Sequence, residues 1–252
     1  MNLGLDRRTV LLTGATGGIG TAVARAYAGQ GARLALGYAH RADEARQLAA
    51  ELGGDDRAFA VRLRIDEPDS TEAAVAAATA RWGGVDVLVA GAMMPGGLRP
   101  PTARFEELPP EEWARFVADN TAHTLRTVQL VLPAMRRSGW GRVVLLSSVV
   151  ARIGKPGREF YGAVKGGLHG LVRSLVWDLR DTGILVNTVS PGLTLTPAVA
   201  AALPPGRRAG EEEATPTGRL STPDDIAAAV LFLGSAANGN ITGEDLAVAG
   251  GR

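Results

Sequence analysis

A tyrosine and a lysine stand four residues apart in the segment FYGAVKGG, residues 160–167. Four residues make about one turn of an α-helix, so Tyr161 and Lys165 would share a helix face. A phenol has an ordinary pKa near 10, but an ammonium roughly 5–6 Å away stabilises the phenolate by about 3 kcal/mol at an effective dielectric constant near 20. The pair therefore predicts a tyrosine that acts as a general acid beside a tuning lysine. The alternative is a chance pair on a helix surface.

Two serines end the strand that is expected just before this helix. The run GRVVLLSS, residues 141–148, is apolar and β-branched until it reaches Ser147 and Ser148. Ligands of a parallel sheet bind beyond the carboxyl ends of its strands. A serine hydroxyl at that place can hold and polarise a carbonyl oxygen, and either serine is suited to this role.

The segment TGATGGIG, residues 13–20, joins a predicted strand to a predicted helix. Gly14 permits a tight backbone turn, Gly18 permits close approach of a ligand, and Gly20 lets the helix pack tightly on the sheet. Because the first amides of a helix attract anions, this turn predicts a site for a dinucleotide pyrophosphate. A purely structural tight turn is the alternative.

The end of the second predicted strand indicates which nicotinamide cofactor binds. A carboxylate at this place would bind a ribose 2′-hydroxyl and repel a 2′-phosphate. The sequence has Tyr38 there, followed by His40 and Arg41. The lack of an acid and the positive charge favour NADP(H), whereas NAD(H) is possible if Arg41 is only a solvated residue near a helix start.

Short apolar runs alternate with helical patterns along the whole chain. The predicted strands are residues 9–13, 33–38, 58–64, 85–90, 141–148, 184–190 and 245–249. The predicted helices are residues 19–30, 42–52, 69–82, 110–135, 160–180 and 223–234. Strands that are apolar throughout are typical of a parallel sheet covered by helices on both faces. The fold class is therefore α/β, with one domain over residues 1–252 built on a doubly wound parallel seven-stranded sheet.

Composition excludes several other classes of protein. The chain is 46% hydrophobic and 21% charged, its formal net charge is +1, and it has no cysteine. A nucleic-acid surface is not indicated, and neither a disulfide nor a thiolate metal site is possible. The first residues lack the apolar core of a signal peptide, and no apolar run has membrane-spanning length. The simplest expectation is a soluble, cytoplasmic protein that binds no membrane.

The three histidines, His40, His123 and His169, are isolated in the sequence. They do not show the spacing of a metal site, so we expect surface or packing roles and no metal. Glu211, Glu212 and Glu213 are expected in a solvated loop.

These motifs together resemble the short-chain dehydrogenases/reductases, a family with a single-domain Rossmann fold. The resemblance covers nearly the whole chain and is carried by TGATGGIG (13–20), Asn120, Ser148, YGAVK (161–165), VNTVSPG (186–192) and ITGEDLAVAGG (241–251). It implies that Tyr161 is the general acid, that Ser148 orients the carbonyl, and that Lys165 binds the nicotinamide ribose and tunes the tyrosine. Asn120 would hold a water of the proton relay, or it is an ordinary helix residue.

The resemblance also implies which residues hold the dinucleotide. They lie in the glycine turn, after the second and third strands, at the end of the fourth strand, at the catalytic pair and after the sixth strand. They are Gly14, Thr16, Gly17, Gly18, Ile19, Gly20, Tyr38, His40, Arg41, Asp66, Ala90, Gly91, Ala92, Tyr161, Lys165, Pro191, Gly192, Thr194 and Thr196.

Two strand ends depart from the family pattern. The fourth strand usually ends in Asn-Asn-Ala-Gly, whereas this chain has Ala90-Gly91-Ala92-Met93. A side-chain amide that stabilises the sheet is thus missing, and Met93 stands where glycine would let the cofactor approach. After the third strand, Arg64 replaces an aspartate that meets the adenine, and Asp66 follows two positions later. These changes bear on cofactor affinity more than on catalytic capacity.

The resemblance implies an NADPH-dependent ketoreductase similar to 3-oxoacyl-acyl-carrier-protein reductases and polyketide ketoreductases. Its substrate would be a small-molecule or carrier-bound ketone, reduced at a β-ketoacyl thioester, a polyketide or a related biosynthetic intermediate. An NAD-dependent secondary-alcohol dehydrogenase and a non-catalytic dinucleotide-binding protein are the alternatives. The family's assembly through two long helices implies a homotetramer or homodimer.

Substrate contacts are expected from the parts of the chain that are least like the family, residues 93–105 and a loop at about 191–216. Leu193 and Val199 suggest an apolar lid over the pocket, although a surface loop is also compatible with the pattern. Arg99 and Arg104 are expected to be solvated, and contact with an acidic carrier or a carboxylate is the alternative.

Overall fold

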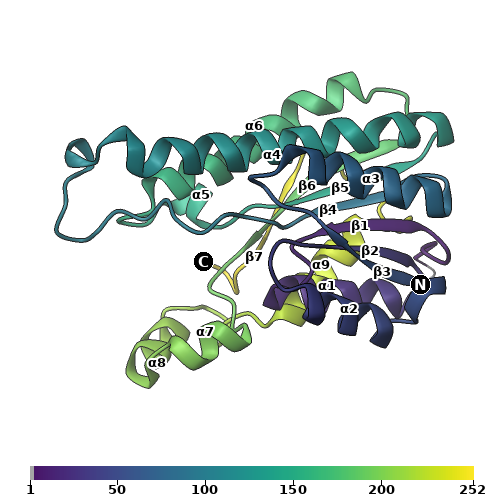
Figure 1. The fold of residues 1–252 in the computed structure, drawn as a ribbon. Helices are drawn as coiled ribbons and strands as arrows, with labels where there is room; N and C mark the ends of the chain where they lie inside the picture. The colour runs from purple at the N-terminus through teal and green to yellow at the C-terminus, as the bar shows by residue number, and fades with distance from the viewer. Residues whose placement is uncertain (1–2) are drawn as a thin grey trace.

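The computed structural model describes residues 3–252 and contains a seven-stranded sheet with helices on both faces (Figure 1). The strand order is β3-β2-β1-β4-β5-β6-β7, and every neighbouring pair is parallel. The strands are β1 (Thr9–Thr13), β2 (Arg33–Tyr38), β3 (Ala58–Arg62), β4 (Val87–Ala90), β5 (Gly141–Leu146), β6 (Ile184–Pro191) and β7 (Asp245–Val248). The predicted doubly wound parallel sheet is confirmed.

The central strands are apolar because both of their faces are covered. Every residue of β1 and of β5 is buried, so neither strand shows the alternation of a half-solvated sheet. Strand order reverses between β1 and β4, since the chain builds outward to β3 and then returns to the other side of β1. At such a switch point the loops diverge and leave a crevice beyond the carboxyl ends of the strands.

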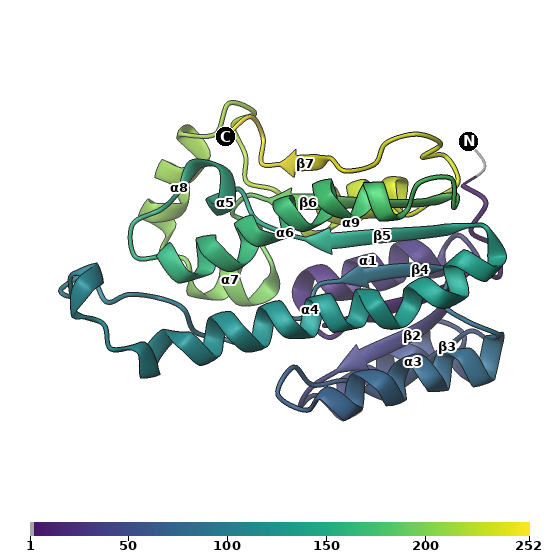
Figure 2. The same cartoon turned by 90° about the horizontal axis from the view of Figure 1, so that it is seen from above.

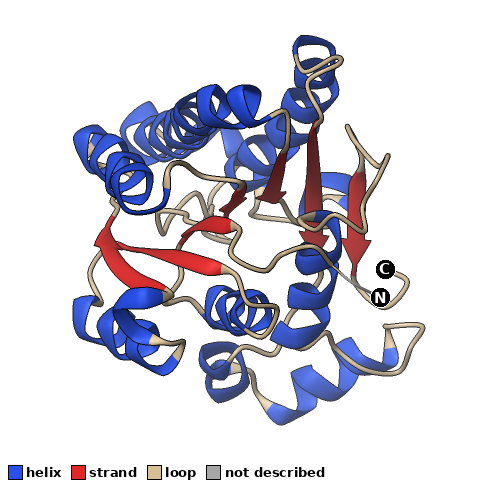
Figure 3. Cartoon of the chain, turned by 90° about the vertical axis from the view of Figure 1, so that its right-hand side faces the viewer, coloured by secondary structure: helices blue, strands red, loops and turns tan. Residues whose placement is uncertain are grey.

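Two helical layers enclose the sheet (Figure 3). The helices α1 (Gly18–Ala28) and α9 (Pro223–Leu233) pack with Val10 and Leu12 in one core, and α2 (Ala42–Glu51) joins them. The helices α3 (Pro68–Trp82), α4 (Pro110–Ser138) and α6 (Glu159–Asp178) pack with Leu11 in the other. The alternation of Val10, Leu11 and Leu12 between the two cores follows from the two-residue period of a strand.

Residues 191–216, expected as a loop, contain two short helices. They are α7 (Pro197–Ala202) and α8 (Pro205–Glu213), and Figure 2 shows both beyond the ends of β5 and β6. Each has proline in its first turn, which suits a helix start, and Thr196 caps α7 by accepting a hydrogen bond from the Val199 amide. Neither helix has a buried residue, so no apolar period exists in the sequence to reveal them.

Other boundaries differ from the expected ones by a few residues. The long helix α4 continues through Pro133 to Ser138, and β5 ends at Leu146, which leaves Ser147 and Ser148 just beyond the strand. A one-turn helix α5 (Val150–Ile153) and the short 3-10 turns η1 (Gly54–Asp56) and η2 (Phe105–Glu107) were not predicted. None of the helices within residues 3–252 is long and apolar enough to cross a membrane.

Two glycines of the turn after β1 have no tolerance for a side chain. Gly14 has φ +74°, in the left-handed region, and a Cβ there would lie 3.1 Å from the Ala92 Cα. A Cβ on Gly20 would overlap the Gly14 carbonyl oxygen and lie 3.0 Å from the Ala15 Cα. The turn and the first helix can approach each other this closely only without that side chain.

We expect Gly20→Ala to lower the free energy of unfolding by about 1–3 kcal/mol, because backbone atoms must move to admit the methyl group. Urea denaturation measures the change. Gly210→Ala in α8 is the matched control, since a Cβ there meets nothing within 4 Å and should be neutral or stabilise by up to about 1 kcal/mol. Equal loss of stability in both variants would contradict the close-packing argument.

Candidate active site

Three cavities lie side by side along the carboxyl edge of the sheet. One of about 450 Å³ lies beyond β2 and β3, one of about 380 Å³ lies above the glycine turn, and one of about 510 Å³ lies between α5 and α8. The first two share Gly14 and Gly17, and the last two share Ser148 and Tyr161. The shared residues make the three cavities one groove, as expected at a switch point.

Tyr161 and Lys165 lie one turn apart near the start of α6, as their spacing predicted. The Lys165 Nζ lies 6.0 Å from the centroid of the Tyr161 ring and donates a hydrogen bond of 2.6 Å to the carbonyl oxygen of Leu146, the last residue of β5. Lys165 is only 7% exposed, and this burial lowers its pKa to about 8. The side chain therefore brings a buried, titratable cation to the tyrosine.

An aromatic stack fixes the first turn of α6. The ring of Phe160 lies between two others, with centroids 5.0 Å from Trp113 of α4 and 5.4 Å from Phe105 of η2. Tyr161 packs against the same cluster, together with Met93. Because Phe160 directly precedes Tyr161, its packing between α4 and η2 restricts where the tyrosine can lie.

The two serines after β5 have different environments. The Ser147 Oγ donates to the Lys165 carbonyl oxygen at 2.9 Å and lies 2.8 Å from His169 Nε2, so Ser147 ties α6 to the strand end. The Ser148 Oγ accepts one hydrogen bond of 3.2 Å from the Val150 amide, and Ser148 lines the cavities on both sides of Tyr161. The Ser148 hydroxyl thus keeps its proton for a ligand, which favours Ser148 over Ser147 as the residue that binds a carbonyl.

His169 was expected to be a simple surface or packing residue, but it belongs to a polar network behind the site. Its Nε2 lies 3.5 Å from Asp245 Oδ1. The same carboxylate oxygen accepts hydrogen bonds of 2.6 Å from Ser190 and 2.7 Å from Thr188. Together with Ser147, this network connects α6 to β6 and β7 and leaves the groove free for Ser148.

Asn120 is buried in α4 and does not line any of the three cavities. Its Oδ1 accepts a hydrogen bond of 2.8 Å from the Met94 amide, and its Nδ2 donates one of 2.7 Å to the Phe116 carbonyl oxygen. The side chain therefore holds the turn that follows β4, which is more than an ordinary helix residue does. A role in holding a relay water stays a prediction.

The unusual end of β4 is held by a side chain from the neighbouring strand. The Thr13 Oγ1 accepts hydrogen bonds of 3.0 Å from the amides of both Gly91 and Ala92. These amides would otherwise lack a partner at the end of the sheet, which would cost free energy. Met93 packs with the aromatic cluster and lines two cavities, so the altered motif forms an ordered wall of the groove.

The cavity beyond β2 and β3 combines polar and apolar walls. His40, Arg41 and Asp66 line it as predicted, and so do Thr16, Gly14, Gly17, Gly91 and Ala92. Tyr38 and Ala90 do not line it: Tyr38 ends β2 with its carbonyl bonded to the Leu63 amide, and Ala90 pairs within the sheet. Ala39, Leu63 and Ile65 also line it and were not predicted, and Met94 lines it from the stretch expected on the substrate side. These residues lie at or after the ends of predicted strands, and their position near the carboxyl ends of those strands could have indicated that they line the cavity.

Arg64 contacts two residues that line this cavity, Asp66 and His40. It is ion-paired with Asp66 at 2.7 Å, and its Nη1 lies 3.0 Å from His40 Nδ1. The hydrogen bond from Arg64 holds the pKa of Asp66 below its ordinary value. Arg41 pairs with Glu44 at 3.1 Å on the exposed surface, where such a pair is weak, so its guanidinium can change partner at low cost.

The glycine turn fits a dinucleotide. Gly17, the N-cap of α1, has no side-chain cap, so the first amides of the helix are open to an anion. Gly17, Gly18, Ile19 and Gly20 line the middle cavity, and Pro191, Gly192, Thr194 and Thr196 line its other side. These are the residues predicted for the cofactor, and they bring the groove to Tyr161 and Lys165.

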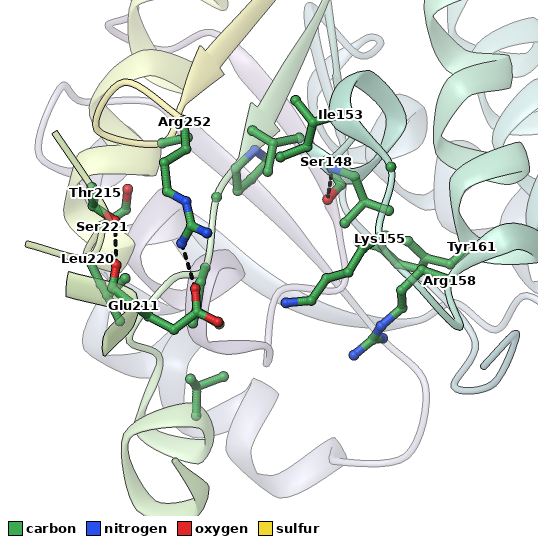
Figure 4. A pocket seen from close by; sticks show the side chains of 18 of the residues that line it. Ser148, Ile153, Lys155, Arg158, Tyr161, Glu211, Thr215, Leu220, Ser221 and Arg252 are labelled. Carbon is green, nitrogen blue, oxygen red and sulfur yellow. Dashed lines mark hydrogen bonds and ion pairs between the residues drawn. The ribbon is translucent and has the colours of Figure 1, made fainter. Parts of the chain in front are cut away.

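Two expectations for the substrate side are wrong. Arg99 is not solvated: its side chain is 18% exposed and donates to Glu159 at 2.7 Å and to the Ala103 carbonyl. Glu211 is not in a solvated loop: it lies on α8, lines the 510 Å³ cavity and pairs with Arg252 at 2.5 Å (Figure 4). Both acquire partners from distant parts of the chain, which a local pattern does not contain.

Known proteins resemble this chain over its whole length. A family model described as enoyl-(acyl carrier protein) reductase matches residues 14–252. A 3-oxoacyl-[acyl-carrier-protein] reductase of Vibrio cholerae is 36% identical over 99% of this chain and 98% of its own. The structure of a short-chain glucose/ribitol dehydrogenase from Brucella melitensis is 33% identical, with a TM-score of 0.88 over 100% of this chain and 98% of that one.

The structure of a 7α-hydroxysteroid dehydrogenase complexed with NADH and 7-oxo glycochenodeoxycholic acid is also 33% identical, with a TM-score of 0.90 over 99% of this chain and 96% of that one. These relatives are reductases and dehydrogenases that act on a CH–OH or C=O group. The chain belongs to the short-chain dehydrogenase/reductase family and is an oxidoreductase of that NAD(P)-dependent class.

Proposed function

We propose that the protein is an NADPH-dependent ketoreductase that transfers a hydride to a ketone of a β-ketoacyl thioester, a polyketide or a related biosynthetic intermediate. One observation supports it most: Ser148 and Tyr161 line both the dinucleotide groove and the 510 Å³ cavity, with Lys165 buried behind them. A ketone in that cavity therefore meets two hydroxyl groups at the place where the groove ends.

The residues divide the work at the carbonyl oxygen. The Ser148 hydroxyl donates a hydrogen bond that orients and polarises the carbonyl. Tyr161 gives its phenolic proton to the same oxygen as that oxygen gains negative charge. The ammonium of Lys165, 6.0 Å from the tyrosine ring, stabilises the phenolate that remains. A nicotinamide cofactor bound in the groove supplies the hydride.

The preference for NADPH rests on His40 and Arg41 at the cavity beyond β2, where no acidic residue occupies the strand end. A 2′-phosphate would find charge-assisted hydrogen bonds there. The Vibrio cholerae relative, named as a 3-oxoacyl-[acyl-carrier-protein] reductase, supports ketone reduction. The hydroxysteroid dehydrogenase complexed with NADH supports the alternative, an NAD-dependent alcohol dehydrogenase.

A homodimer or homotetramer through α4 and α6 is part of the proposal. Both helices expose large apolar side chains, Leu125 at 39% and Trp177 at 77%. Association of these faces would remove such side chains from water. A cytoplasmic location stays a prediction from the sequence.

We expect Tyr161→Phe to reduce the rate of ketone reduction by about 10²–10⁴-fold, since the proton donor is lost, and to leave the Kd for NADPH within about threefold. The assay follows NADPH oxidation with a panel of β-keto thioesters and polycyclic ketones. Tyr38→Phe is the matched control, because Tyr38 ends β2 without lining the groove. Turnover that survives in Tyr161→Phe would refute the mechanism, and a wild-type protein that reduces no member of the panel would refute the function.

We expect Lys165→Met to lower the activity of the protein and to raise its free energy of unfolding. Burial lowers the pKa of Lys165 from 10.5 to about 8, so charging it costs the folded state on the order of 3 kcal/mol below pH 8. Its hydrogen bond to Leu146 offsets about 1 kcal/mol of this cost. The folded protein therefore gains stability as pH rises from 8 toward 10.5, where only the unfolded chain keeps the proton.

At pH 7 we expect Lys165→Met to be more stable than wild type, with a free energy of unfolding that is about 1–2 kcal/mol higher. We expect the same variant to reduce ketones about 10²-fold more slowly, or more slowly still. The difference in stability should narrow between pH 8 and 10.5. Urea denaturation across this pH range measures it, with the exposed Arg180→Met as control. The buried-ammonium account would be contradicted if Lys165→Met were less stable than wild type at pH 7, or if the difference in their free energies of unfolding did not change with pH.

The cofactor preference is tested by fluorescence titration with NADPH and NADH. Wild type should bind NADPH at least about tenfold more tightly, and Arg41→Met should reduce this ratio by about fivefold or more without weakening NADH. Arg46→Met in α2, the helix that Arg41 precedes, is the control, because Arg46 is exposed, pairs with Asp43 and does not line the cavity. Equal affinities in wild type would instead favour the NAD-dependent dehydrogenase.

A further inference from the structure

The 510 Å³ cavity next to Tyr161 is positively charged. Four ionisable side chains with charges at neutral pH line it: Lys155, Arg158, Glu211 and Arg252. Three are cationic and one is anionic, which gives the wall a side-chain charge of +2. A cavity built only for a neutral ketone would have no use for this excess.

The one acidic side chain that lines this wall already has a partner. Glu211 forms an ion pair of 2.5 Å with Arg252, and this hydrogen bond is the largest cause that holds the pKa of Glu211 below its ordinary value. Lys155 has a smaller effect on the same carboxylate and lies beyond the distance of an ion pair. Glu211 and Arg252 therefore neutralise each other across α8 and the end of the chain.

Lys155 and Arg158 remain without any carboxylate partner among the described residues. Neither forms an ion pair or a side-chain hydrogen bond within residues 3–252, whereas most other arginines around the molecule do. Arg158 is half-buried, and its guanidinium lies 6.0 Å from the centroid of the Tyr161 ring. In Figure 4 the exposed Lys155 side chain extends toward the side of the pocket that holds Glu211, and the Arg158 guanidinium lies below it.

We infer that Lys155 and Arg158 form a subsite for a carboxylate on the ketone substrate, so that the protein acts on oxo acids. This rests on the proposed reduction of a ketone and narrows its substrate. On this short segment the guanidinium can bind a carboxylate through two parallel hydrogen bonds, and the ammonium can contact the same carboxylate as a point charge. The same segment, residues 155–158, leads directly into Tyr161, so binding the carboxylate also places the carbonyl.

The distance favours a small acid over a carrier-bound substrate. Arg158 lies beside the Tyr161 ring, and the anion must therefore be only a few bonds from the carbonyl. In a carrier-bound thioester the phosphate lies at the far end of a long pantetheine arm, whereas a carboxylate can stand on the substrate itself.

The test compares oxo acids with their methyl esters. Rates of NADPH oxidation are measured for the series from 3-oxobutanoate to 7-oxooctanoate, for each methyl ester, and for the N-acetylcysteamine thioester of 3-oxobutanoate. In wild type, kcat/KM for the best acid should exceed that for its ester by at least about tenfold. Lys155→Met/Arg158→Met should remove this preference and change the ester and thioester rates by less than about threefold. Arg180→Met, which removes an exposed cation beyond the far end of α6, should retain it.

Binding is measured separately, so that failure of the subsite is not confused with failure of the reductase. Calorimetry with the oxo acid and its ester uses protein saturated with NADP, a mixture in which no hydride can be transferred. Tighter binding of the acid in wild type, lost in the double variant, supports the subsite even if no ketone is turned over. Equal binding or turnover of acid and ester, a preference for the thioester, or a preference that survives in the double variant would overturn it.

Discussion

The site depends on one buried ammonium. Lys165 extends from α6 to the carbonyl oxygen of Leu146, where β5 ends, and this contact fixes the helix against the strand that directly precedes Ser147 and Ser148. An unpaired cation in such a place is costly, and burial lowers the pKa of Lys165 to about 8. The surrounding structure compensates with rigid packing: the Phe160 stack on one side and the Ser147 hydroxyl bond on the other. The buried ammonium of Lys165 therefore lowers the stability of the fold at the position where proton transfer from Tyr161 needs a positive charge.

The parts of the protein that the sequence revealed are those set by local periodicity. A pair four residues apart must share a helix face, and apolar runs that alternate with helical patterns must form a covered parallel sheet. This is why the shared helix face of Tyr161 and Lys165 and the parallel sheet covered on both faces followed from the chain alone. The helices α7 and α8 did not, because they bury nothing. The pair of Arg99 with Glu159 joins residues 60 positions apart, and no local pattern encodes it.

The end of β4 shows how one backbone requirement can be met by a different side chain. The resemblance pointed to a missing asparagine amide and so to weaker cofactor binding. In this chain Thr13 on the neighbouring strand accepts hydrogen bonds from the Gly91 and Ala92 amides, and Asn120 accepts one from Met94. Three backbone amides within four residues are thus held from two elements, β1 and α4. The position of Met93 in the aromatic cluster then follows from packing, and the groove keeps an ordered wall there.

The chemistry and the choice of substrate reside in different kinds of structure. Ser148 lies just beyond β5, and Tyr161 and Lys165 lie on α6, where hydrogen bonds and packing hold each of them. The far wall of the cavity is α8, which buries no residue and is joined to the end of the chain through Glu211 and Arg252. A wall that bears no part of the core can change its charge at little cost to the fold. Relatives with the same fold therefore carry the names of different substrates, and in this chain the carboxylate subsite that we propose, Lys155 and Arg158, faces this wall from the segment before α6.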